Sequence, residues 1–312
     1  MRDYVTVHLG CADGFTRKSH RFGYSVLTFI YSFPFAVLPV TMPPLIPEEI
    51  QTLLFAAANR YHRPDFILDD PIGIPHRFTN AADIEISGFW VAMLSWGQRK
   101  SIIASANRLL ERMDNAPYDF ITNHTEPDRR RFTDFVHRTF QPLDALFFLE
   151  RLQQHYRTHD SLETMFLTDP NTYLHDTVEQ ALVTFHQNFF DHPDAPDRTR
   201  KHVATPARGS TCKRLCMFLR WMVRHEPPQT EARVDFGIFK TLRPAQLVLP
   251  LDVHVERQAR RLGLITRTAT DWRTALELTH TLRTLDPLDP ARFDFALFGL
   301  GIEGKRNDFI GG

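Results

Sequence analysis

The chain of 312 residues carries 37 basic and 37 acidic side chains, so its formal net charge at pH 7 is zero. Its apolar share of 43% excludes disorder along the whole length, and its balanced charge means that any attraction to nucleic acid must come from a local basic face. The three cysteines exclude a disulfide framework and favour a reducing compartment, the cytoplasm.

The N-terminal stretch differs from the rest of the chain. Three basic residues precede an apolar run over 24–40, which looks like a signal peptide. The run is broken by Pro34 and lacks a cleavage site of small residues. We therefore interpret residues 1–41 as a dispensable or wrongly assigned extension before a domain over 42–312. No other segment is apolar enough to span a membrane.

Helical periodicity dominates from residue 47 onward. Residues 47–60 predict an amphipathic helix, and residues 83–113 predict a buried helix that kinks near Gly97 and continues with a more exposed stretch. Further stretches of helical pattern, separated by Asp, Pro and Asn, are 143–156, 162–166 and 177–190. Residues 234–239 are too few to support more than a local hairpin. The sequence therefore predicts an all-α fold.

One segment places a lysine at the start of a helix. Ser210 or Thr211 is expected to cap this helix, which leaves Lys213 in its first turn. At helical spacing Lys213, Arg220 and Arg224 share a face, which suits phosphates, although such a row is commonly just a solvated charged face. The positive end of the helix dipole and the two arginines favour a neutral, nucleophilic amine.

A second segment places an acid at the start of the next helix. Asp252 is predicted at the N-cap and Gly263 just beyond the C-terminal end. An aspartate in this position is commonly only a cap, but its carboxylate could also stabilise an oxocarbenium-like sugar or orient a water molecule. Three arginines on the outer surface of this helix could meet a phosphate backbone: Arg257, Arg260 and Arg261.

No Cys and His set has the spacing of a metal site. Cys212 and Cys216 lie one helical turn apart without a second pair, whereas a structural zinc or an iron-sulfur cluster needs four ligands. His254 has no partner at metal spacing, and we interpret it as structural. A later helix, with Asp289 as its predicted cap, is interpreted as a packing helix. The sequence therefore predicts neither a metal ion nor a cofactor.

In this order, the segments resemble the helix-hairpin-helix DNA glycosylases, the superfamily of endonuclease III and the 8-oxoguanine glycosylases. PLDVHVERQARRLGL looks like the Val-Asp-x-His segment of that superfamily, which implies that Asp252 is the catalytic aspartate. GSTCKRLCMFLRWM resembles the hairpin and helix that carry the nucleophilic lysine, which falls on Lys213. The whole is similar to a family of uncharacterised bacterial proteins at the edge of the superfamily.

The resemblance extends from about residue 42 to the C-terminus. GFWVAMLSWGQRKSII is similar to the early helix and turn that reach the DNA, which implies DNA contacts for Gln98 and Arg99. The usual Leu-Pro-Gly-x-Gly hairpin is replaced by TPARGSTCK, and a segment at 223–250 is inserted between the lysine and the aspartate. The C-terminal cysteines of endonuclease III are absent, so no iron-sulfur cluster is expected.

The resemblance implies a cleft between two helical lobes that acts on damaged duplex DNA. A base would be flipped out, Lys213 would attack C1′ of the sugar, and Asp252 would assist, giving base release with strand cleavage. The alternative is a non-catalytic nucleic-acid-binding protein of the same fold, favoured by the altered hairpin and the zero net charge. A third hypothesis, a helical protein without a nucleic-acid role, predicts that no contiguous basic face joins four arginines: Arg220, Arg224, Arg257 and Arg260.

Overall fold

The computed structural model describes residues 45–167, 174–225 and 233–310. The α-helices in these ranges are α1 (Glu48–Tyr61), α2 (Ala81–Leu94), α3 (Arg99–Glu111), α4 (Pro117–Asn123), α5 (Glu126–Arg129), α6 (Pro142–Tyr156), α7 (Glu163–Phe166), α8 (Glu179–Phe189), α9 (Lys213–Val223), α10 (Val253–Arg261), α11 (Trp272–Arg283) and α12 (Asp294–Ile310). Short 3-10 helices link them, and no β-strand occurs in the described ranges, so the prediction of an all-α fold is confirmed. The predicted extension over 1–41 lies outside the described residues.

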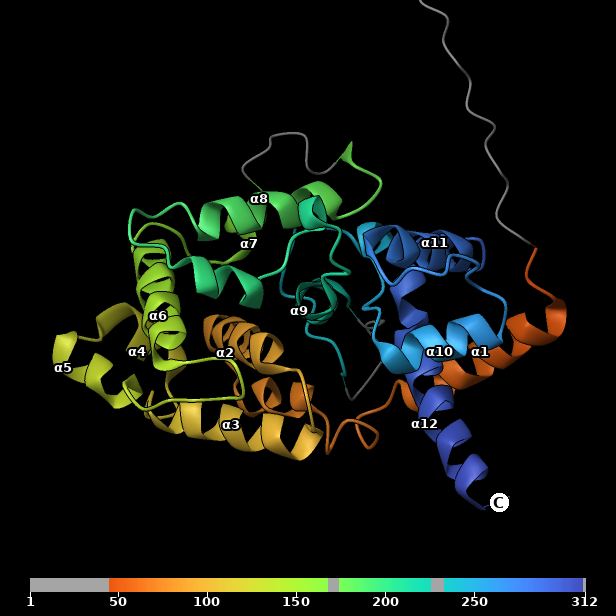
Figure 1. Cartoon of the computed structure of the whole chain (residues 1–312), viewed down its shortest axis with the longest axis horizontal. Coiled ribbons are helices and arrows are strands. Elements are labelled where there is room, and N and C mark those ends of the chain that lie inside the picture. The colour runs from red at the N-terminus through yellow and green to blue at the C-terminus, as the bar shows by residue number, and fades with distance from the viewer. Residues whose placement is uncertain (1–44, 168–173, 226–232, 311–312) are drawn as a thin grey trace, which may run out of the picture. The chain divides into compact units, whose positions relative to one another are not determined.

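Residues 43–312 form one compact unit. Within it α2 packs against α3, α4 and α9, while α1 and α10 both pack against α12. Figure 1 shows α9 between the helices α2 to α8 and the helices α1, α10, α11 and α12. None of the helices in the described part of the chain is long and apolar enough to cross a membrane.

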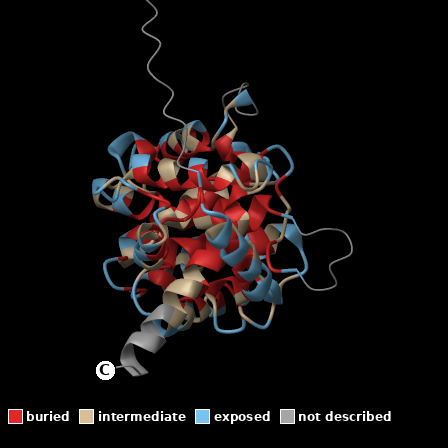
Figure 2. Cartoon of the chain, turned by 90° about the vertical axis from the view of Figure 1, so that its right-hand side faces the viewer, coloured by how far each residue is buried: buried red, intermediate tan, exposed pale blue. Residues whose placement is uncertain are grey.

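Helix α2 lies in the core, as its apolar sequence predicts. Residues 84–94 are all buried, and Figure 2 shows buried residues filling the interior of the unit. Gly88 allows α2 and α9 to approach closely, because a Cβ atom at this position would lie 2.7 Å from Cε of Met222. A larger residue at this position would therefore require the Met222 side chain to move.

The predicted kink near Gly97 is a complete break between α2 and α3. Gly97 has φ of +101°, a conformation that side-chain-bearing residues rarely adopt, and a Cβ atom there would lie 2.7 Å from the guanidinium of Arg138. Both effects favour glycine at this turn. The break matters for function because residues 95–99 line the pocket described below, with Gln98 as the exception.

The inserted segment after α9 is described only in part, since residues 226–232 lie outside the described residues, and its described part forms no strand. The backbone N–H of Phe236 donates to the carbonyl of Trp221 at 2.8 Å, and that of Phe239 donates to Met222 at 2.9 Å. The chain therefore turns back along the C-terminal end of α9 instead of pairing with itself. This turn buries Asp235 completely, which places a carboxylate beside the arginines of α9.

A second buried acid, Glu85 on α2, gives the fold a predictable dependence on pH. Its carboxylate accepts hydrogen bonds from Oγ of Ser161 at 2.9 Å and from the backbone N–H of Leu162, while burial raises its pKa to about 7. A carboxyl group whose pKa is raised in the folded state stabilises the protein most when the pH is below its ordinary pKa near 4.5. This stabilisation is lost as the pH rises through 7.

We therefore expect Glu85→Gln to gain stability relative to the wild type as the pH rises from 5 to 8. The gain in unfolding free energy should be on the order of 3 kcal/mol, since one pKa unit corresponds to about 1.4 kcal/mol. Urea denaturation at both pH values measures it, and the exposed Glu49→Gln is the control, which should show no such gain. An equal difference at both pH values would contradict the prediction.

Candidate active site

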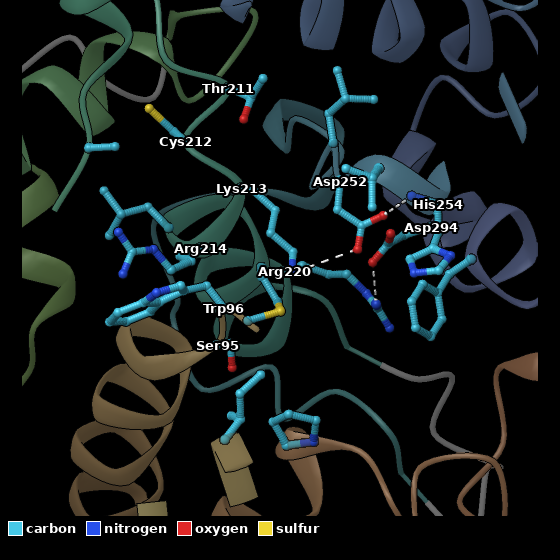
Figure 3. A pocket seen from close by; sticks show the side chains of 18 of the residues that line it. Ser95, Trp96, Thr211, Cys212, Lys213, Arg214, Arg220, Asp252, His254 and Asp294 are labelled. Atoms are coloured by element: carbon cyan, nitrogen blue, oxygen red, sulfur yellow. Dashed lines mark hydrogen bonds and ion pairs between the residues drawn. The ribbon is translucent and has the colours of Figure 1, made fainter. Parts of the chain in front are cut away.

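The two residues predicted to be catalytic lie together. Lys213 is the first residue of α9, and Asp252 caps the N-terminus of α10. Oδ1 of Asp252 accepts hydrogen bonds from the backbone N–H groups of His254 and Val255 at 2.8 and 3.0 Å, which confirms the predicted cap. The other oxygen, Oδ2, lies 3.7 Å from Nζ of Lys213 (Figure 3). One carboxylate thus fixes the helix start and faces the amine.

The start of α9 differs from the prediction that Ser210 or Thr211 caps it. The N-cap residue is Cys212, which has φ of +50° and makes no side-chain cap hydrogen bond. Oγ of Ser210 instead accepts from the N–H of Cys212 at 3.2 Å, and Gly209, three residues before Cys212, adopts φ of +73°. The prediction failed because Gly209 and Cys212 both adopt left-handed backbone conformations before the helix, and residue type alone does not reveal this geometry.

Both residues line a pocket with a volume of about 740 Å³. Its walls come from the turn between α2 and α3, from the residues before α9, from α9 and α10, and from the first turns of α12. Trp96, Phe295 and Phe298 supply aromatic surface. A pocket that combines such surface with a few charged groups is typical of small-molecule sites.

Two arginines lie on the aromatic residues of this pocket. The guanidinium of Arg214 is 4.9 Å from the ring of Trp96, and it donates to the carbonyls of Met93 and Lys201 at 2.6 and 3.1 Å. Burial lowers the pKa of Arg214 to about 10. The guanidinium of Arg99 lies 5.5 Å from the ring of Phe298. These contacts hold the aromatic rings and cations in fixed positions.

Carboxyl groups also border the pocket beside Asp252. Burial raises the pKa of Asp294 to about 6, although its bond with Arg220 opposes the rise. Burial also raises the pKa of Asp70, against the charge of Arg99, whose Nη2 lies 3.6 Å from the Asp70 carboxylate. Acids with raised pKa values in a pocket are candidates for proton transfer.

The predicted row of exposed cations along α9 is wrong for Arg220 and Arg224. The Arg220 side chain is 1% exposed, and its guanidinium contacts Asp294 and Asp235 at 2.6 and 3.3 Å. Arg224 is also buried and contacts Asp235 and Asp289, each at 2.8 Å. These arginines neutralise buried carboxylates, so they form no exposed basic face with the arginines of α10, which is the arrangement that the third hypothesis predicts. Asp289 does occupy the N-cap position before Pro290, at the start of the 3-10 helix Pro290–Phe293, but its side chain binds Arg224 and makes no cap hydrogen bond.

The other residues predicted to contact DNA lie at or near the surface. Gln98 is exposed at the N-cap of α3, and Arg257 and Arg261 are exposed on α10. Arg260 is half-buried, because its guanidinium binds Glu256 at 2.7 Å and also reaches backbone carbonyls. The structure therefore brings Lys213, Asp252, Arg99 and the buried Arg220 to one pocket. The other predicted residues do not line it: Gln98, Arg224, Arg257, Arg260 and Arg261.

Sequence reasoning missed Asp294, Arg214 and Trp96 as residues of the site. Arg214 directly follows the predicted lysine, so its position was a usable signal. No sequence signal marked Asp294 as a site residue, because it opens a helix whose apolar pattern predicted only a packing role. Cys212 and Cys216 are buried free thiols, and the described residues contain no group of three or more His, Cys, Asp or Glu side chains that could hold a metal ion.

The chain is thus an all-helical protein with a pocket in which a lysine and an aspartate from different helices face each other. The model of one protein family, described as a protein of unknown function (DUF2400), matches residues 70–303, and the chain belongs to this family. No curated protein and no solved structure matches the chain. The likeness to the helix-hairpin-helix glycosylases, with two lobes and a cleft, stays a prediction.

Proposed function

We propose that the protein is a DNA glycosylase with an associated lyase activity, in which Lys213 is the nucleophile and Asp252 assists it. One observation carries the proposal: Nζ of Lys213 lies 3.7 Å from Oδ2 of Asp252 inside the pocket, although the two residues begin different helices. An amine whose proton can pass to a neighbouring carboxylate is equipped for nucleophilic attack.

The pocket also suits a flipped-out nucleoside. Its volume of about 740 Å³ lies within the range of small-ligand sites, roughly 300–1,000 Å³. Enzymes that act on a base within a duplex move the nucleotide into such a pocket and hold the base by stacking and hydrogen bonds. Trp96 and Phe298 offer aromatic surface for stacking, and the guanidinium of Arg99 offers hydrogen-bond donors.

The reaction begins with the transfer of a proton from the Lys213 ammonium to Asp252. The neutral amine attacks C1′ of the sugar, forming an N–C1′ bond while the bond from C1′ to the base breaks. The base leaves with the electron pair of that bond and takes up a proton. Opening of the C1′–O4′ bond then gives a Schiff base as O4′ gains a proton and the new nitrogen loses one, and the carboxyl group of Asp252 serves as donor to O4′ and acceptor from nitrogen.

The proposal is tested by borohydride trapping on a duplex oligonucleotide with a single abasic site. Borohydride reduces a Schiff base to a stable amine, so wild-type protein should form a covalent complex that is visible by denaturing electrophoresis. Lys213→Ala should form none, because the attacking amine is gone. Lys201→Ala is the matched control, since Lys201 is an exposed lysine of the same pocket. This variant should trap as the wild type does.

Each other result would count against part of the proposal. If trapping survives Lys213→Ala and is lost in Lys201→Ala, the nucleophile is Lys201 and not Lys213. Absence of both a complex and base release with the wild type would contradict the enzyme activity. Salt-dependent binding to the same duplex would then favour the non-catalytic nucleic-acid-binding alternative.

A further inference from the structure

A second carboxyl group faces the pocket from the start of α12. Asp294 lines the pocket together with Lys213 and Asp252, and its side chain is only 9% exposed. Its Oδ2 accepts a hydrogen bond from Nη1 of Arg220 at 2.6 Å. Figure 3 shows its carboxyl group beside that of Asp252, where α10 and α12 meet. The mechanism above gives this group no role.

The buried network behind Asp294 joins it to several charged groups. In the described part of the chain, two guanidiniums, Arg220 and Arg224, contact three carboxylates, Asp235, Asp289 and Asp294, and Nε2 of His62 lies 3.9 Å from Oδ2 of Asp235. Burying an ionised carboxylate in a low-dielectric interior is costly, which favours the protonated form of Asp294. Asp294 is the carboxyl group of this network that also borders the pocket, where a proton can be exchanged with a bound molecule.

The electrostatic surroundings of Asp294 also favour its protonated form. Burial raises its pKa to about 6, the bond and charge of Arg220 oppose the rise, and the charges of Asp252 and Asp235 add to it. The protonated form therefore persists to a higher pH than for an ordinary aspartate. The hydrogen bond from Arg220 holds the group in place in either state.

We propose that Asp294 is the general acid of the reaction, which donates its proton to the base as the bond from C1′ to the base breaks. The inference rests on the proposed function. The electron pair of the breaking bond goes to the base nitrogen, which takes the proton of the Asp294 carboxyl group. Asp294 becomes a carboxylate that Arg220 stabilises, while Asp252 keeps the proton from Lys213. The neutral base leaves, and the total charge of the site is unchanged.

Other ionisable groups will also shape the pH dependence. Those on the elements packed around the start of α12 are Lys213, Cys216 and Arg220 on α9, Asp252 and His254 at the start of α10, Asp235 after α9, His62 after α1, and Arg292 before α12. A wild-type pH profile alone would therefore be ambiguous. The difference between the wild type and a variant of Asp294 isolates the contribution of this residue.

Asp294→Asn provides the test, because asparagine still offers Arg220 an oxygen acceptor but has no acidic proton. Single-turnover base release is measured from pH 5 to 8 on duplexes that contain 8-oxoguanine, uracil or hypoxanthine. Borohydride trapping is measured in parallel on a duplex with a preformed abasic site, from which no base must leave. We expect base release to fall about 100-fold and to lose its decline above pH 6, while trapping is unchanged.

The matched control is Asp289→Asn, which removes a charge from the same network at a position that does not line the pocket. It should leave base release unchanged. The proposal is overturned if Asp294→Asn releases base at the wild-type rate, or if it loses release and trapping together, which would indicate a structural role. It is also overturned if the wild type traps at abasic sites but releases none of the three bases.

The two proposals fail in different ways. Wild-type protein that releases a base but does not trap would contradict Lys213 as the nucleophile. The effect of Asp294→Asn on base release would still decide the role of Asp294, because a leaving base needs a proton whichever nucleophile attacks. Neither release nor trapping by the wild type would overturn both proposals.

Discussion

Replacing Asp252 by asparagine should lower the rate of base release and of trapping at an abasic site by about 100- to 10,000-fold, the range typical of a lost acid–base group. The loss is expected because an amide can neither take the proton of the Lys213 ammonium nor stabilise positive charge on the sugar. The melting temperature should stay near that of the wild type, because Asn caps helices about as well as Asp, and Oδ1 can accept the same two backbone hydrogen bonds.

Two further variants separate chemistry from helix capping. Asp252→Ala removes the cap as well as the charge and should also lose about 0.5–2 kcal/mol of stability. Asp271→Asn alters another N-cap aspartate, which accepts from the N–H of Thr274 at 3.0 Å and does not line the pocket. It should leave both reactions intact. Wild-type rates in Asp252→Asn would reduce Asp252 to a structural cap, the simpler of the two roles that its sequence position allows.

Local signals predicted the helices and the position of Asp252 because their causes lie within a few residues. The apolar surface of residues 84–94 predicts a buried helix, and the φ of Gly97 explains the break that follows it. Asp252 precedes an apolar helix face and Gly263 follows it, so both ends of α10 could be read directly. The cap at Cys212 depends on a left-handed backbone conformation, so the start of α9 could not be predicted in the same way.

Long-range pairing explains why the arginines of α9 were misplaced. Helical spacing correctly puts Lys213, Arg220 and Arg224 on related positions, but it cannot say whether that face meets water or protein. The partners of Arg220 lie 15 and 74 residues further along the chain, at Asp235 and Asp294. Charged side chains without a partner are usually exposed to solvent, so the sequence predicted that the arginine face of α9 is exposed. Only the folded structure shows that buried carboxylates lie opposite these arginines.

The same reasoning applies to the candidate site. The resemblance assigned roles to Lys213 and Asp252, and the structure brings both into one pocket, although their separation could not be calculated from sequence. Asp294 could not be recognised, because its environment depends on Arg220 from a different helix. A single buried guanidinium thus links the stability of the core to the chemistry of the pocket.

This link makes Arg220 the residue whose replacement should cost the most stability. Arg220→Met fills a similar volume but leaves Asp235, which is fully buried, and Asp294 without their shared partner. Removing one member of a buried ion pair typically costs about 3–5 kcal/mol, because the remaining charges stay desolvated. Urea denaturation at pH 8 should show a loss of this size, whereas the exposed Arg257→Met should change stability by no more than about 0.5 kcal/mol.

The loss should shrink as the pH falls. Because burial raises the pKa of Asp294 to about 6, this carboxyl group becomes neutral at lower pH and no longer needs its cation. Arg220→Met should therefore be closer to the wild type at pH 5 than at pH 8. A pH-independent loss would mean that the carboxyl group stays ionised beside Arg220 throughout, in which case Asp294 could not act as the acid that releases the base.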